Sequence, residues 1–161
     1  MNQDIFIDRK NRKVIKPEDR AVEDRNSVYG FIIESEKLLL VRAEGFDKWE
    51  IPGGGQEENE DDFTALKREM LEEANCEIRE IGELIGQDQC NFYADDLDKY
   101  FLGKRRYYLV KKYTFIEKPL QNEIEENKMF PLSKFDFSFV RIDHRKIIRK
   151  ILLQKNGGEN D

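Results

Sequence analysis

The sequence predicts a single α/β domain, and three observations support this fold class. Short apolar runs with β-branched residues, typical of buried strands, recur along the chain. Apolar residues spaced three and four apart indicate two amphipathic helices, one near the middle of the chain and one near its end. No repeat, low-complexity segment or internal linker divides the 161 residues, a length at which one domain is usual.

The first third of the chain predicts an arm followed by strands. Residues 1–26 are polar with short apolar islands, so we expect an N-terminal arm or small hairpin there and the main domain over residues 27–155. Two apolar runs, Val28–Ile33 and Leu38–Val41, are joined by a short polar turn and predict a hairpin of buried strands. Trp49–Ile51 is expected to be a short strand, ended by a proline and three glycines.

A helix and three further strands are expected next. Phe63, Leu66 and Met70 recur at helical spacing, and Ala74 completes the apolar stripe, so a helix is expected over Asp61–Ala74. The further strands are expected at Ile78–Gly86, Arg106–Ile116 and Lys128–Leu132, with a long polar insert at Asp88–Lys104.

The last segment predicts an amphipathic helix over Arg141–Gln154, followed by a disordered tail at 156–161. His144 is the only histidine, and it precedes Arg145 and Lys146 on this helix. We therefore expect His144 on a solvated surface, and a single histidine excludes a metal site built from several histidines.

Charge and cysteine usage exclude several classes of protein. Asp and Glu number 34 against 28 Lys and Arg, a net charge of -6, so the chain lacks the excess of cations that binds nucleic acid polymers. No apolar run approaches the roughly 18 residues of a membrane span, and the first residues lack the apolar stretch of a signal peptide. Cys76 and Cys90 have neither metal-binding nor redox spacing. We expect a cytoplasmic protein without membrane or nucleic acid partners.

The middle helix carries the residues most suited to chemistry. Glu69, Glu72 and Glu73 lie three and four positions apart, so they share one helix face and repel one another. A divalent cation with a preference for oxygen ligands, Mg²⁺ or Mn²⁺, would remove that repulsion. The glycines at 53–55, just before the helix, allow a backbone to approach a ligand closely. The alternatives are a solvated acidic face and an ordinary glycine turn.

The joint spacing of these residues resembles the signature of the Nudix hydrolase family. Gly54 is followed after five residues by Glu60, and after seven more by Arg68-Glu69-Met70-Leu71-Glu72-Glu73, so the box extends from Gly54 to Cys76. Asn75 stands where the family pattern has a glycine, Cys76 replaces an aliphatic residue, and Asn59 replaces a frequent glycine. Asparagine is the side chain best suited to a left-handed helix cap. The resemblance implies an α/β/α sandwich around a mixed β-sheet.

The resemblance also implies the site residues. Glu69, Glu72, Glu73 and the main-chain carbonyl of Gly53 would bind one or more Mg²⁺ or Mn²⁺ ions. Arg68 would pair with neighbouring carboxylates and keep this face aligned, with Glu60 at the junction of loop and helix. The base that activates water would be Glu72, Glu73 or a later carboxylate, for which Glu126 is preferred, with Glu125 and Glu123 behind it. The alternative for residues 123–126 is an exposed acidic turn.

The implied reaction is metal-dependent hydrolysis of the pyrophosphate bond of a nucleoside diphosphate linked to another group. Besides Arg68, candidate substrate-binding residues are Lys104, Arg106 and Tyr93. Lys104 and Arg106 could instead form a basic patch on an exposed strand, and Tyr93 could pack the insert onto the sheet. The alternative functions are a non-catalytic Nudix-fold module that binds nucleotides, and an isomerase. The expected partner is a small nucleotide, and a homodimer is left open.

Overall fold

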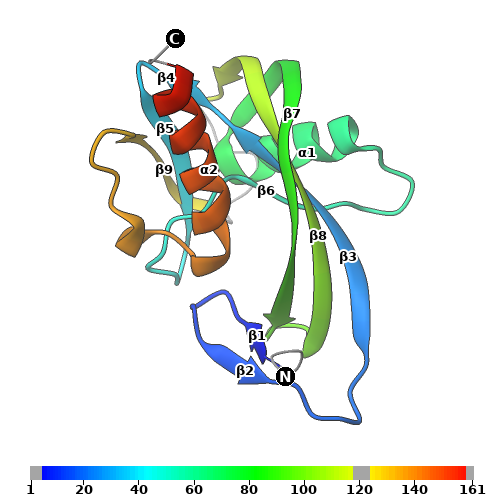
Figure 1. Ribbon diagram of the computed structural model, residues 1–161. Coiled ribbons are helices and arrows are strands. Elements are labelled where there is room, and N and C mark those ends of the chain that lie inside the picture. The colour runs from blue at the N-terminus through cyan, green and yellow to red at the C-terminus, as the bar shows by residue number, and fades with distance from the viewer. Residues whose placement is uncertain (1–4, 118–123, 159–161) are drawn as a thin grey trace.

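A computed structural model describes residues 5–117 and 124–158, and it confirms the predicted α/β/α arrangement (Figure 1). A six-stranded mixed sheet in the order β2-β1-β7-β8-β3-β6 and a three-stranded sheet in the order β4-β5-β9 lie between two helices. The helices are α1 (Asp62–Ala74) and α2 (Ile142–Gly158), and Phe137–Phe139 form a short 3₁₀ turn before α2. The strands are β1 (Ile5–Ile7), β2 (Lys13–Ile15), β3 (Val22–Phe31), β4 (Ile33–Glu34), β5 (Lys37–Ala43), β6 (Gly53–Gly55), β7 (Cys76–Ala94), β8 (Lys99–Phe115) and β9 (Ile124–Pro131).

The alternation of side chains along the strands divides the core into two clusters. On β5, Leu39 and Val41 pack toward α1, whereas Leu38 and Leu40 pack toward α2. The α1 side also contains Leu66 and Met70 from the helix, and the α2 side contains Tyr107, Ile147, Ile148 and Ile151. Each helix therefore covers one face of the sheets.

The N-terminal segment forms a hairpin that joins the large sheet. β1 and β2 pair antiparallel, and β1 also pairs parallel to β7 at Ile7 and Phe92. The next strand, β3, begins at Val22 rather than at residue 28, because it pairs parallel to β8 along its whole length. Its first residues are polar and gave no apolar signal. Trp49–Ile51, expected to be a short strand, makes only single bridges with Val41 and Val140.

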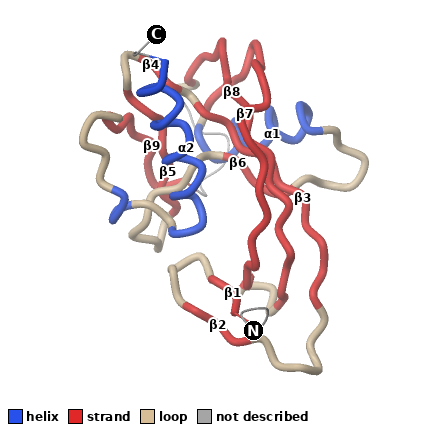
Figure 2. The backbone as a smooth tube through the Cα atoms, in the orientation of Figure 1, coloured by secondary structure: helices blue, strands red, loops and turns tan. Residues whose placement is uncertain are grey.

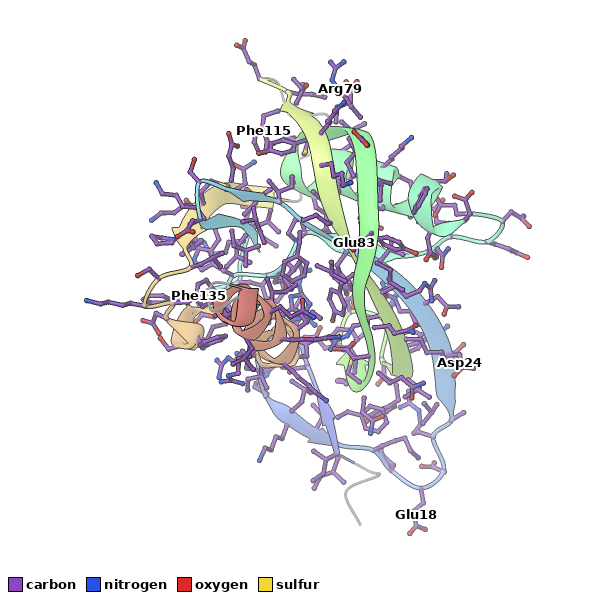
Figure 3. All side chains as sticks on the ribbon, turned by 45° about the horizontal axis from the view of Figure 1, so that its top comes forward. Glu18, Asp24, Arg79, Glu83, Phe115 and Phe135 are labelled. Carbon is purple, nitrogen blue, oxygen red and sulfur yellow. The ribbon has the colours of Figure 1, made fainter. Side chains whose placement is uncertain are left out.

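The prediction of a polar insert at Asp88–Lys104 is wrong. β7 and β8 continue through this region as one long antiparallel hairpin, with a tight turn at residues 95–98 (Figure 2). Its strands are polar here because their side chains pair across the hairpin, as Arg105 does with Asp88 at 2.7 Å. In Figure 3, Arg79 and Phe115 lie at one end of the large sheet, and Glu18 and Asp24 lie near the other.

The prediction that His144 lies on the surface is also wrong. His144 has no exposed surface, and its Nδ1 accepts a hydrogen bond of 3.0 Å from the Ile51 N–H. It shares the buried face of α2 with Ile147, Ile148 and Ile151, at the helical spacing that the apolar residues define. Burial lowers the pKa of His144 to about 3, so the ring is neutral at pH 7.

α2 continues past Gln154 to Gly158, because residues 155 and 156 do not break a helix and the first unfavourable residues are the two glycines at 157 and 158. Of the expected tail, residues 159–161 lie outside the described part of the chain. Within the described residues, no helix is both long enough and apolar enough to cross a membrane.

Candidate active site

Gly53–Gly55, which form β6 and which we call the glycine loop, lie directly against α1. β6 pairs antiparallel with β3, and a Cβ at Gly53 would lie 2.2 Å from the Val28 carbonyl oxygen, so only glycine fits. The backbone of Gly53 also has a φ of 147°, which favours glycine. A Cβ at Gly54 would lie 2.6 Å from Oε2 of Glu69. The missing side chains therefore let the Glu69 carboxylate reach the loop backbone.

Both ends of α1 are capped, the first by a side chain and the second by the backbone of a residue in the left-handed conformation. The Asp61 carboxylate accepts a hydrogen bond of 2.8 Å from the Thr64 N–H at the start of the helix. At the other end, Asn75 has a φ of 51°, and its N–H bonds to the Met70 carbonyl. Asn59 also has a positive φ, 70°. The two asparagines that replace glycines of the signature thus both adopt left-handed conformations, which asparagine tolerates.

Arg68 joins the loop to the acidic face of the helix. Its Nε and Nη2 each donate a 2.8 Å bond to the Glu60 carboxylate, and Nη2 also donates to the Gly55 carbonyl at 3.0 Å. Its Nη1 donates to Glu69 at 2.9 Å and to Glu72 at 3.2 Å. The Arg68 guanidinium, with the Glu57 N–H, lowers the pKa of Glu60 to about 2. Arg68 therefore fixes two carboxylates of the helix, Glu69 and Glu72, relative to Glu60 and the Gly55 carbonyl.

The carboxylate face of α1, formed by Glu69, Glu72 and Glu73, carries a surplus of negative charge. Glu73 retains some exposed surface, but the surrounding protein excludes most of the solvent around its carboxylate. This burial, and to a smaller extent the negative charges of Glu69 and Glu50, raises the pKa of Glu73 well above the usual range. The Gly53 N–H lies 3.4 Å from Glu73 Oε2. Burial also raises the pKa of Glu69. Hard oxygen donors at such a surplus suit a divalent cation, although within residues 5–117 and 124–158 no three acidic, His or Cys side chains converge closely enough to hold one.

A second set of charges is buried nearby and is balanced. Glu50 accepts two bonds from Arg9, at 2.9 and 3.1 Å, and one of 3.0 Å from Arg141. Arg141 also donates a 2.8 Å bond to Asp143. Asp143 accepts a further bond of 2.9 Å from Arg105, which in turn pairs with Asp88. We call this the balanced network; its members are Arg9, Arg105, Arg141, Glu50, Asp88 and Asp143. Sequence reasoning missed it, although a glutamate between Trp49 and Ile51 was a signal that this charge needs partners.

The two sets of charges meet at a cavity of about 370 Å³. Residues of β3, β7 and β8 line it, together with Gly53 and Gly54 and with Arg9 of the N-terminal hairpin. Gly53, Gly54 and Glu73 line one part of it. Other parts of the lining include aromatic side chains and arginines, among them Phe46, Phe92, Phe101, Arg9, Arg25 and Arg141, together with acidic side chains such as Glu50 and Asp143. Such a lining suits a ligand with both flat apolar and anionic parts.

None of the four substrate-binding candidates, Arg68, Lys104, Arg106 and Tyr93, lines this cavity. Lys104 is half-buried, and its Nζ lies 3.4 Å from Oδ2 of Asp24. Arg106 makes two 2.6 Å bonds to Asp62 and so ties α1 to β8. The Tyr93 hydroxyl donates a 2.8 Å bond to Asp98 in the hairpin turn.

The candidate base Glu126 lies on β9, where it faces and pairs with Arg42 of β5. It is absent from the lining of the cavity. The neighbouring Asn127 side chain bonds the Ala74 carbonyl at 2.8 Å, which places this strand beside the C-terminal end of α1. Glu123 lies outside the described residues, and the Glu125 side chain is likewise not described.

A sandwich of two helices around a mixed sheet, with a carboxylate-bearing helix against a glycine loop, is the arrangement of a class of hydrolases. The model of the NUDIX domain matches residues 23–151, so the chain belongs to the Nudix hydrolase family. Members act on small nucleotides, hydrolyse pyrophosphate bonds of nucleoside diphosphate derivatives, and generally use divalent metal cations.

Solved structures agree with this assignment. The solution structure of the E. coli ORF135 protein matches with a TM-score of 0.65 at 18% identity, over 87% of this chain and 96% of that one. A NUDIX hydrolase from Nitrosomonas europaea matches with a TM-score of 0.64 at 20% identity, over 83% and 91% of the two chains. A UDP-X diphosphatase matches with a TM-score of 0.58 at 21% identity, over 88% and 68%. Identities this low support a shared fold only. No curated protein matches the chain.

Proposed function

We propose that this protein hydrolyses the pyrophosphate bond of a nucleoside diphosphate derivative by attack of water on phosphorus, with Mg²⁺ or Mn²⁺ as cofactor. The observation that supports this most directly is the surplus of negative charge on the carboxylate face, beside the glycine loop and at the edge of a cavity. Carboxylates that repel one another bind a cation readily, and that cation neutralises a pyrophosphate.

Each residue of the site has a proposed role. Glu69, Glu72, Glu73 and the Gly53 carbonyl would hold the metal, which when bound stabilises charge on the phosphate oxygens. Arg68 positions Glu69 and Glu72 through its hydrogen bonds to both. Glu73 is preferred as the base because it lines the cavity, whereas Glu126 is paired with Arg42 on β9.

The test is a substrate panel with variants. Purified protein is assayed with Mg²⁺ and with Mn²⁺ against nucleoside triphosphates, ADP-ribose, dinucleoside polyphosphates and nucleotide sugars. We expect turnover of at least one class, lost by about a hundredfold or more in Glu72→Gln and Glu73→Gln. Lys112→Gln, which alters an exposed pair with Glu80, should keep full activity.

Two outcomes would contradict the proposal. Full activity in both glutamine variants would show that the carboxylate face is not the catalytic site. Nucleotide binding without any product, across the whole panel and with metal present, would show a binding module in place of an enzyme.

A further inference from the structure

The arginines that line the cavity differ in their partners. Arg9, Arg105 and Arg141 all donate hydrogen bonds to carboxylates of the balanced network. Arg25 lines the same cavity, but within the described part of the chain its guanidinium has no hydrogen-bond acceptor and no carboxylate within ion-pair distance. It is the cavity arginine whose donors are unused.

Arg25 is nevertheless held in place. It projects from β3, where its backbone pairs with Gly103 of β8, and its guanidinium carbon lies 5.3 Å from the centre of the Phe101 ring. A Cβ added to Gly55 would lie 2.8 Å from Nη2 and 2.9 Å from Nε of Arg25. The guanidinium therefore lies between an aromatic ring and the end of the glycine loop.

This position is next to the carboxylate face of α1. Gly55 adjoins Gly54, against which the Glu69 carboxylate lies. The positive charge of Arg25 opposes the burial that raises the pKa of Glu69. A substrate whose pyrophosphate lies at that face would bring an anionic group within the reach of Arg25. A guanidinium offers five N–H donors in a planar fork that matches phosphate oxygens.

We propose that Arg25 is a substrate-binding residue that donates hydrogen bonds to a phosphate group of the substrate, beside the carboxylate face. The inference rests on the proposed function for the place of the pyrophosphate. It assigns the anionic end of the substrate to the glycine-loop side of the cavity, which leaves the side of Phe46 and Phe92 for the remainder of the nucleotide.

The chain offers a matched control. The guanidinium of Arg20 also lies 5.3 Å from an aromatic ring, that of Tyr100, which neighbours Phe101 on β8 and faces the opposite side of the sheet. Arg20 does not line the cavity, and its guanidinium bonds Asp98 at 3.2 Å. Arg20, in the bend just before β3, lets Arg20→Gln remove the same chemical group without touching the proposed site.

The experiment compares Arg25→Gln, Arg25→Lys and Arg20→Gln. Binding of inorganic pyrophosphate with Mg²⁺ is measured by calorimetry, KM and kcat on the substrate found by the panel, and folding by thermal unfolding. We expect Arg25→Gln to weaken pyrophosphate binding and raise KM by about ten- to a hundredfold, Arg25→Lys to recover part of the loss, and Arg20→Gln to change neither.

An unchanged Kd and KM in Arg25→Gln would overturn the inference, as would an equal loss in Arg20→Gln. A lower unfolding temperature with unaltered binding would show that Arg25 only offsets the charge of the carboxylates. The two proposals fail separately. If the wild type binds pyrophosphate through Arg25 but hydrolyses nothing, the proposed function is wrong and the Arg25 site stands; normal hydrolysis by Arg25→Gln overturns the Arg25 site alone.

Discussion

Two groups of three carboxylates both contribute to the lining of the same cavity, Glu73 from one and Glu50 and Asp143 from the other, and the fold treats them differently. Glu50, Asp88 and Asp143 face three arginines of the balanced network. The carboxylate face of α1 faces Arg68, which is also bonded to Glu60. In the first group every charge has a partner, so it joins the N-terminal hairpin, the sheet and α2 into one scaffold. In the second, negative charge is left over. The difference separates the charges that hold the molecule together from those available to a cation.

Breaking the balanced network should give the largest effect on stability. In Arg141→Met, Glu50 and Asp143 lose a buried partner, so we expect the free energy of unfolding to fall by about 3–5 kcal/mol. Urea unfolding followed by circular dichroism measures this. Lys112→Met removes an exposed pair with Glu80 and should change stability by less than about 1 kcal/mol. Equal effects of the two variants would contradict the scaffold role.

The neutral His144 next to this network should make stability depend on pH. Its pKa is about 3 in the folded chain against 6.5 for an ordinary histidine, so below pH 6.5 the unfolded chain takes up a proton that the folded chain does not. The contribution of His144 is complete above pH 6.5 and is lost as the pH falls toward 3, by up to about 1.4 kcal/mol per pH unit. Urea unfolding at several pH values should show a shallower decline for His144→Asn, which keeps an acceptor for the Ile51 N–H. Parallel curves for the two proteins would refute this.

On the carboxylate face, removing a charged group should raise stability, whereas in the balanced network it lowers stability. In metal-free buffer Glu73→Gln removes a carboxylate from the vicinity of Glu69 and Glu50, and we expect stability to rise by about 1 kcal/mol. Adding Mg²⁺ should stabilise the wild type more than this variant. Glu50→Gln, the corresponding change in the balanced network, should be destabilising. Thermal unfolding with and without Mg²⁺ measures all three, and a loss of stability in metal-free Glu73→Gln would remove the distinction between the groups.

The smallest effect is expected at the C-terminal end of α1, which orients this face. Asn75→Ala places alanine at a φ of 51°, so we expect a loss of about 1 kcal/mol. Asn75→Gly should change the free energy of unfolding by no more than about 0.5 kcal/mol. Glycine adopts this conformation without strain, but it makes the unfolded chain more flexible. Chemical denaturation distinguishes the two variants, and equal stabilities would show that the left-handed cap is not limiting.

The fold class and the residues of the carboxylate face could be predicted because both depend on local patterns. Helical spacing alone places Glu69 and Glu73 on one face, and the uninterrupted apolar run Leu38–Val41 predicts a buried strand. The balanced network could not be predicted in this way. Arg105 meets Asp88 only through the register of a long hairpin, and its polar strands looked like an insert. His144 looked exposed for a similar reason, since its sequence neighbours are basic while its partner, Ile51, is distant in the sequence.

The N-terminal hairpin contributes a residue to this site from outside the span that the family model matches. The family match begins at residue 23, whereas Arg9 comes from the turn between β1 and β2. Arg9 donates two hydrogen bonds to Glu50, and its guanidinium carbon lies 4.4 Å from the centre of the Phe46 ring. A chain trimmed to the matched span would leave Glu50 facing Glu73 with Arg141 as its remaining arginine. The short N-terminal hairpin thus supplies a positive charge beside the cavity, although the signature residues of the site all come later in the sequence, from Gly54 to Cys76.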